Sequence, residues 1–160
     1  YPDFGVYLFR SKRLFLAVRC GAIGQNGRGG HAHNDQLAIE LMVNGEDWIA
    51  DPGSYLYTAD RESRNAYRSV AAHAAPRMGV REPGRLDLGD FWLGDEAQAR
   101  CLWFADNRFV GEHRGFGALV RREVEVQDDR IVIRDSGAGM APGPVLGTPP
   151  PRGMGGELSR

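Results

Sequence analysis

Most of this chain alternates apolar and polar residues with a period of two, and turn signals interrupt the alternation at short intervals. That pattern is typical of short strands with one buried face, and it predicts an antiparallel all-β sandwich or barrel, of which we expect the sandwich. Asn44-Gly45 is the strongest short hairpin signal in the chain. The expected strand pairs are 5–10 with 14–20, 36–43 with 46–51, 99–105 with 108–113, and 119–127 with 130–135.

Two segments depart from this pattern. Residues 60–70 have helical spacing behind a capping Asp60, which predicts one short helix. Residues 137–160 are about half Gly and Pro, and such a segment buries too little apolar surface to offset its chain entropy. We therefore expect a β domain over residues 1–136 and a disordered tail over residues 137–160.

Composition and charge exclude several classes of protein. Of the 160 residues, 42% are hydrophobic, which suffices for a core, and the net charge of −1 gives no broad field for nucleic acid. No run reaches the ~18 apolar residues of a membrane span. The chain begins at Tyr1 without an initiator Met, so we expect it to be part of a longer protein. Cys20 and Cys101 are either a disulfide or two unpaired core thiols, which leaves the compartment open.

The residues most suited to chemistry lie between Gly29 and His73. Three of the four histidines, His31, His33 and His73, fall there together with Asp51. If residues 31–35 are extended, His31, His33 and Asp35 point to the same side, as a strand presents several ligands to one metal ion. Imidazole and carboxylate groups are ligands for zinc or another divalent transition metal. The alternative is that they are hydrogen-bonded or solvated loop groups.

The register of the predicted hairpin bears on Asp51. A strict two-residue turn at Asn44-Gly45 pairs Ala38 with Asp51, which places the carboxylate on the face opposite to His33. A β-bulge, or Pro52 ending the strand, must then redirect Asp51 if it is to join the histidines.

Aromatic and basic side chains are mixed around the predicted helix. Tyr57, Arg64 and Arg68 belong to this group, and stacking rings with arginine forks suit an acidic sugar. The alternative is an amphipathic helix with a solvated arginine face. The three tryptophans, Trp48, Trp92 and Trp103, lie in strand-like surroundings and are expected in the core.

The stretch GGHAHNDQLAIELMVNGEDWIADPGSYLYTADRESRNAYRSVAAH resembles the metal-containing, supersandwich-like β domain of the heparinase II/III-like polysaccharide lyases, over about residues 5–135. The resemblance implies an N-terminal α/α toroid partner domain, an acidic uronate-containing polysaccharide as substrate, cleavage by β-elimination, and a place in the periplasm or cell envelope. It also implies a structural zinc on His33, Asp51 and His73, a catalytic His31, and substrate-binding Arg64, Arg68 and Tyr57.

Two features separate this chain from that family pattern. The family usually has Asn-Thr after its last histidine, where this chain has Ala74-Ala75, and the toroid is absent from residues 1–160, so the chain alone is expected to be inactive. A non-catalytic, zinc-stabilised glycan-binding or assembly module is the alternative. A cupin site is disfavoured, because it has three or four residues between its second histidine and a Glu, and this chain has Leu37 and Ala38 at those positions.

Overall fold

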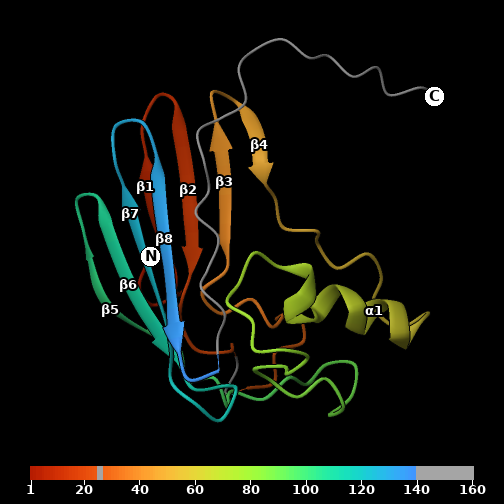
Figure 1. The fold of residues 1–160 in the computed structure, drawn as a ribbon. Coiled ribbons are helices and arrows are strands. Elements are labelled where there is room, and N and C mark those ends of the chain that lie inside the picture. Colours follow the sequence, from red (N-terminus) through yellow and green to blue (C-terminus); the bar gives the residue numbers. More distant parts are fainter. Residues whose placement is uncertain (25–26, 140–160) are drawn as a thin grey trace, which may run out of the picture.

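The computed structural model describes residues 1–24 and 27–139 as two antiparallel four-stranded sheets (Figure 1). The predicted tail falls outside the described residues from 140 onward, whereas the last strand includes Gly137. One sheet has the order β1 (Val6–Arg10), β2 (Leu14–Arg19), β3 (Ile39–Val43) and β4 (Glu46–Ile49). The other has the order β5 (Arg100–Ala105), β6 (Arg108–His113), β7 (Val120–Val126) and β8 (Ile131–Gly137).

The apolar faces of both sheets form one core, which confirms the predicted sandwich. Leu16, Val18 and Ile39 from the first sheet cluster with Phe109, Val120 and Val124 from the second, and all six side chains are buried. On β7, the polar Arg121 and Glu123 alternate with the buried Val120, Arg122 and Val124. A two-layer sandwich buries the period-two apolar residues on one side of each sheet.

The only α-helix among the described residues is α1 (Arg61–Arg68), followed by the 3₁₀ turn η1 (Val70–Ala72). Asp60 caps α1, accepting hydrogen bonds from the backbone N–H groups of Glu62 and Ser63. The helix lies to one side of the sandwich, on the side of β4 and away from β5 (Figure 1). No helix in the described part of the chain is long and apolar enough to cross a membrane.

The hairpin of β3 and β4 contains a bulge, one of the two alternatives that the register argument allowed. Asn44 and Gly45 both have positive φ, as a two-residue turn demands, and Val43 pairs with Glu46 as expected. Leu41 then pairs with Ile49 rather than Trp48, because the register shifts between Leu41 and Met42. One extra residue in β4 reverses the facing of the strand residues that follow it, and Asp51 lies beyond the end of the strand at Ile49.

Three local predictions were wrong. Residues 36–38 are not part of the strand, since Leu37 has a φ of +62° and the chain turns there before β3. Residues 31–35 also lie outside any strand, so no alternation fixes the directions of His31 and His33. Trp92 and Trp103 are exposed rather than core, whereas Trp48 packs against the core cluster. Cys20 and Cys101 are free thiols.

Candidate metal centre

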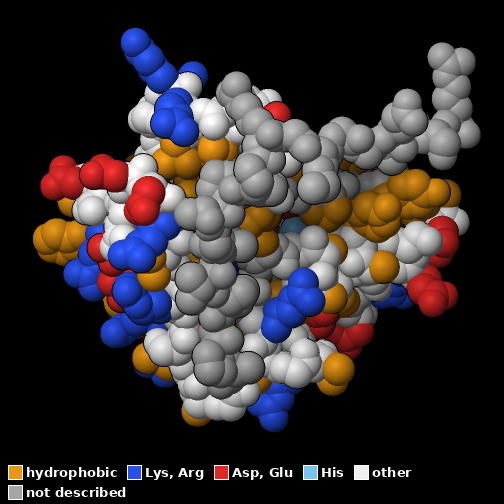
Figure 2. All heavy atoms as spheres, turned by 45° about the horizontal axis from the view of Figure 1, so that its top comes forward, with side chains coloured by type: hydrophobic (Ala, Val, Ile, Leu, Met, Phe, Trp, Pro, Cys, Tyr) orange, Lys and Arg blue, Asp and Glu red, His pale blue; other side chains and the backbone are white. Residues whose placement is uncertain are grey.

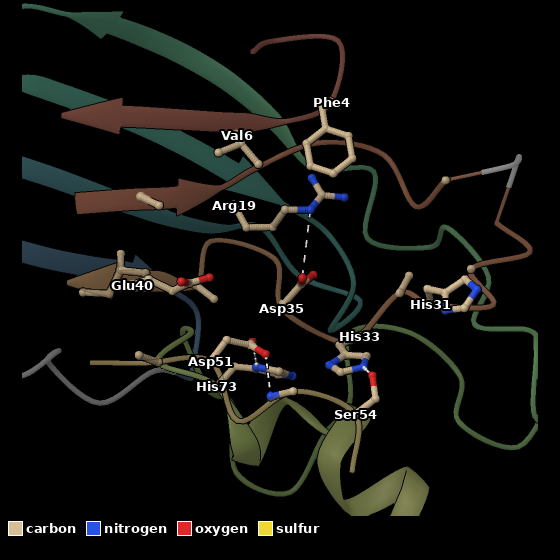
Figure 3. A pocket seen from close by; sticks show the side chains of 18 of the residues that line it. Phe4, Val6, Arg19, His31, His33, Asp35, Glu40, Asp51, Ser54 and His73 are labelled. Atoms are coloured by element: carbon tan, nitrogen blue, oxygen red, sulfur yellow. Dashed lines mark hydrogen bonds and ion pairs between the residues drawn. The ribbon is translucent and has the colours of Figure 1, made fainter. Parts of the chain in front are cut away.

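His33, Asp51 and His73 meet at one end of the first sheet (Figure 3). Each offers one ligand atom, and these atoms all lie within 4.8 Å of one another. Nδ1 of His73 is 2.9 Å from Oδ2 of Asp51, and the rings of His33 and His73 have centroids 5.2 Å apart. The two imidazoles are buried and the carboxylate is exposed, so the cluster has an inner histidine pair and an outer acid.

A different local structure positions each of the three. His33 precedes Asn34, whose backbone N–H donates to the Arg68 carbonyl over 2.9 Å and so ties this loop to α1. Asp51 follows the bulged strand β4, and its Oδ1 accepts a hydrogen bond of 2.8 Å from the Gly53 N–H. His73 ends η1.

The electrostatics leave His33 available as a neutral ligand. Burial, together with the nearby His73, Arg68 and Arg64, lowers the pKa of His33 to about 4, while Asp51 opposes the shift. The imidazole of His33 is therefore uncharged near neutral pH. Both ring nitrogens of His73 are buried and form no hydrogen bond among the described residues, although Nδ1 lies close to the Asp51 carboxylate.

These residues fit a divalent metal ion. A buried polar atom without a partner costs free energy, and a cation among the three side chains would give the orphaned nitrogen of His73 a partner. Two imidazoles and one carboxylate are a familiar zinc ligand set. Hydrogen bonds to the other ring nitrogen orient histidine ligands, and Oγ of Ser54 lies 3.2 Å from Nε2 of His33.

His31 stands apart from the cluster. Its ring is exposed and turned away from His33 and His73 (Figure 3). Nδ1 of His31 lies 3.2 Å from the Tyr57 hydroxyl, and the two rings meet edge to face with centroids 5.4 Å apart. Tyr57, predicted to bind substrate, thus contacts the predicted catalytic histidine.

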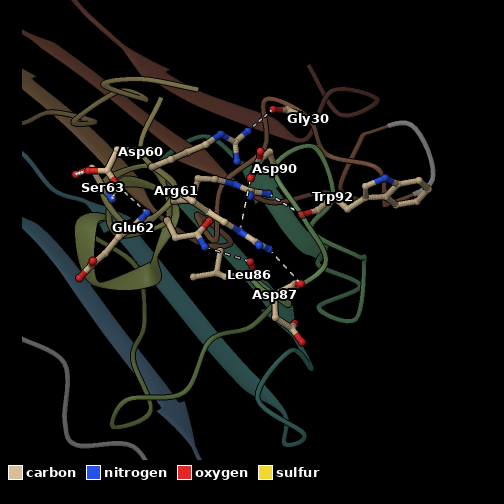
Figure 4. Close-up of polar contacts among 12 residues, drawn as sticks. Gly30, Asp60, Arg61, Glu62, Ser63, Leu86, Asp87, Asp90 and Trp92 are labelled. Atoms are coloured by element: carbon tan, nitrogen blue, oxygen red, sulfur yellow. Dashed lines mark hydrogen bonds and ion pairs between the residues drawn. The ribbon is translucent and has the colours of Figure 1, made fainter. Parts of the chain in front are cut away.

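Arg64 and Arg68 lie beneath this region rather than on its surface. Their exposures are 2% and 1%, and their guanidinium groups donate to backbone carbonyls. Arg64 donates to Gly30 over 3.0 Å, and Arg68 donates to Ala32 over 3.3 Å and to Trp92 over 2.9 Å (Figure 4). Direct contact between these arginines and a substrate stays a prediction.

A cavity of about 560 Å³ connects the cluster with His31, and it contains charged residues that the sequence reasoning did not assign. Asp35 sits 4.0 Å from Nε of Arg19, and desolvation raises the pKa of its carboxyl group while Arg19 opposes the shift. Glu40 has a raised pKa because of burial and the nearby Asp51. Asp35 stood in the sequence at the end of the histidine-rich segment, whereas nothing local marked Arg19 or Glu40.

Fold and site together define a β-sandwich domain with a His-Asp-His candidate metal centre at one end. The family model described as "Heparinase II/III-like, C-terminal" matches residues 1–146. The chain therefore belongs to the heparinase II/III-like family, as its C-terminal domain. No protein among the curated proteins matches the chain.

Proposed function

We propose that this chain is the C-terminal β-sandwich part of a polysaccharide lyase that cleaves uronate-containing acidic polysaccharide by β-elimination. The observation that carries the proposal is the separation of two histidine environments on one cavity. His33 and His73 are buried beside Asp51, while His31 is exposed two residues from His33. One set suits a structural ion and the other suits a substrate. Family membership supports the lyase class.

The reaction requires three actions: neutralising the uronate carboxylate, removing the C5 proton, and protonating the C4 leaving oxygen. His31 would perform one of the first two, and the rest would come from an α/α toroid domain. The partner of Nδ1 decides between the roles. If the Tyr57 hydroxyl donates to Nδ1, Nε2 carries the proton and can donate to the carboxylate; if Nδ1 donates to Tyr57, Nε2 is free to accept the C5 proton.

The ion on His33, Asp51 and His73 would be zinc or another divalent metal with a structural role. Once bound, it would supply a positive charge that fixes the loops of all three ligands. Arg64 and Arg68 would assist by holding the backbone on either side of His31, at Gly30 and Ala32. The periplasm or cell envelope is the proposed location, where an acidic polymer can reach the site.

A non-catalytic, zinc-stabilised glycan-binding module is the second candidate. The residue after His73 is Ala74, where the family pattern has an amide side chain, and that absence removes one polar group from the site. A protein that binds metal and glycan but releases no product, even when joined to its toroid domain, would be this module.

The metal is tested first, with two variants of neighbouring histidines. His33→Ala should lose the metal, while His31→Ala should keep about one ion per chain in elemental analysis of untagged protein. The melting temperature of His33→Ala should fall to that of the chelated wild type, because an ion that binds only the folded state stabilises it. Untreated wild-type protein without metal, and with a melting temperature indifferent to added zinc, contradicts the proposed centre.

The role of His31 is tested on the protein that joins this chain to its toroid domain. His31→Ala should lower turnover roughly 10²-fold or more, the scale of general acid–base catalysis, without loss of zinc. The readout is the ultraviolet absorbance of the unsaturated uronate product. If activity and metal are lost in parallel, His31 is a ligand and the proposed division between the two histidines is wrong.

A further inference from the structure

Next to His31, the chain between η1 and β5 exposes two adjacent aromatic rings. Phe91 is 50% exposed and Trp92 is 46% exposed. The strand-like sequence around Trp92 predicted a core residue, so this exposure is not what the local pattern favours. Adjacent large apolar side chains left in water mark a binding surface more often than single ones do.

This aromatic segment is held in place by polar side chains of α1. Arg61 donates to the Asp87 carbonyl and Asn65 to the Leu86 carbonyl, each over 3.3 Å, and Arg68 donates to the Trp92 carbonyl (Figure 4). These residues recur at helical spacing on one face of α1. The rings are thus presented by a tethered backbone.

The segment adjoins the His31 site directly. A Cβ placed on Gly30 would lie 3.6 Å from Cδ1 of Phe91, so Phe91 packs on the residue that precedes His31. The guanidinium carbon of Arg64 lies 5.5 Å from the Phe91 ring centroid and 5.8 Å from that of Tyr57. A continuous strip therefore runs from His31 and Tyr57, over Arg64, to Phe91 and Trp92.

The charge along this strip is positive. The guanidinium carbon of Arg28 lies 5.5 Å from the Trp92 ring centroid. Nearby acids already have basic partners: Asp87 pairs with Arg85, and Asp90 lies 3.6 Å from Arg61. Among the described residues, Arg28 and the buried Arg64 and Arg68 form no ion pair with a carboxylate. In addition, Nε and Nη1 of Arg64 and Nη1 of Arg68 have no hydrogen-bond partner there.

Hydrophobic side chains also gather at the right of the face shown in Figure 2, where the chain between β4 and α1 lies, and a histidine side chain is visible in a recess beside them. Tyr55 and Tyr57 are exposed members of that chain segment. The apolar surface near the site therefore extends beyond the two rings of the 91–92 segment, as binding of an elongated ligand requires.

We propose that Phe91, Trp92 and Arg28 form a subsite that stacks and charge-pairs a uronate ring of the polymer, next to the ring held at His31. The inference rests on the proposed function for its substrate class. Aromatic faces bind the apolar face of a sugar ring, and a guanidinium pairs with its carboxylate in a planar fork. The geometry favours an acidic sugar over a protein partner because the exposed rings lie beside Arg28, an exposed arginine that forms no ion pair with a carboxylate among the described residues.

Binding of a polymannuronate tetrasaccharide to the 160-residue chain tests the subsite by titration calorimetry, with cellotetraose as the neutral probe. Trp92→Ala should weaken uronate binding about tenfold, on the scale of one aromatic stack. Arg28→Gln should weaken binding of the uronate and leave that of cellotetraose unchanged. Trp103→Ala is the matched control, because Trp103 is an exposed tryptophan on β5, the strand farthest from α1.

The subsite is overturned by no uronate binding by the wild-type chain, by unchanged binding in Trp92→Ala, by equal loss in Trp103→Ala, or by loss only of toroid association in Trp92→Ala, which would make the rings a domain interface. The lyase proposal fails separately. A chain that binds through Trp92 while the joined enzyme forms no product keeps the subsite and refutes catalysis. An active joined enzyme whose KM is unaffected by Trp92→Ala keeps catalysis and refutes the subsite.

Discussion

His113 is almost completely buried at the end of β6, and it forms no ion pair with a carboxylate in the described part of the chain. Its Nδ1 accepts a hydrogen bond from the Gly115 N–H, and its ring packs on Phe116. Burial and, to a lesser extent, the nearby charge of Arg122 lower its pKa to about 4. The ordinary histidine value is about 6.5, so between these two pH values the unfolded chain binds a proton that the folded chain does not.

The stabilising contribution of neutral His113 to the free energy of unfolding should therefore be fully present above about pH 6.5 and should be lost as the pH drops toward 4. The loss is about 3 kcal/mol, from the size of the pKa shift. In His113→Gln the acid decline should be shallower by about this amount. The measurement is urea unfolding at pH 7 and pH 4.5 with a chelator present, so that metal release does not contribute. An unchanged difference between the two pH values contradicts the assignment, and His31→Gln, at an exposed histidine, serves as control.

For individual residues, the sequence predicted which side chains lie together but not the directions in which they point. His33, Asp51 and His73 were chosen from ligand chemistry and family resemblance, and the structure brings them together; that they hold a metal stays a prediction. The exposed position of His31 and its contact with Tyr57 depend on a loop with no periodic pattern, so residue spacing had no means of fixing the direction of either ring.

Among the elements, α1 departs most from sequence expectation. Its bounds and its Asp60 cap were predicted, but its arginine-bearing face is buried instead of solvated. The reason lies outside the helix, in carbonyl groups of the segments around Gly30 and Trp92 that the arginines satisfy. Such partners are distant in sequence, and no local periodicity reports them.

This arrangement makes Arg68 a tether for two loops at once. Arg68→Ala leaves the carbonyls of Ala32 and Trp92 without their donor and opens a cavity, so the free energy of unfolding should fall by about 3 kcal/mol. Hydrogen exchange should accelerate at residues 30–34 and 86–93. Arg61→Ala, on the exposed part of the same helix, should change stability by less than about 1 kcal/mol. Equal effects of the two substitutions would refute the tether.

The strands, unlike α1, agree closely with what the sequence predicted. Both hairpins of the first sheet and both of the second follow from turn chemistry and alternation, with ends shifted by a few residues. The parity of the register also made either a bulge or a strand end at Pro52 predictable, and the structure has the bulge. Its place beside Leu41 was not predictable, because tertiary packing of Ile49 against the core decides where the extra residue goes.

Across the whole molecule, one buried ion pair links the second sheet to the loops of the candidate metal centre. Arg122 on β7 and Asp135 on β8 form two hydrogen bonds of 2.7 Å, and both side chains are buried. Nη1 of Arg122 also donates to the carbonyls of Leu37 and Ala74, at 2.8 and 2.5 Å. Ala74 follows His73 directly, and Leu37 lies in the turn after the His33 segment.

Arg122→Met should therefore affect stability and metal binding by separable routes. The substitution leaves the buried Asp135 carboxylate without its basic partner, which should lower the free energy of unfolding by about 3–5 kcal/mol. The double variant Arg122→Met/Asp135→Leu removes that uncompensated charge and should recover most of the loss, and it keeps the test usable if the single variant does not fold. Metal affinity should stay reduced in the double variant, since the Ala74 carbonyl beside His73 still lacks its donor. Zinc titration of refolded protein against a chelating dye measures this, and wild-type affinity in the double variant would show that the ion pair stabilises the sandwich without positioning the metal centre.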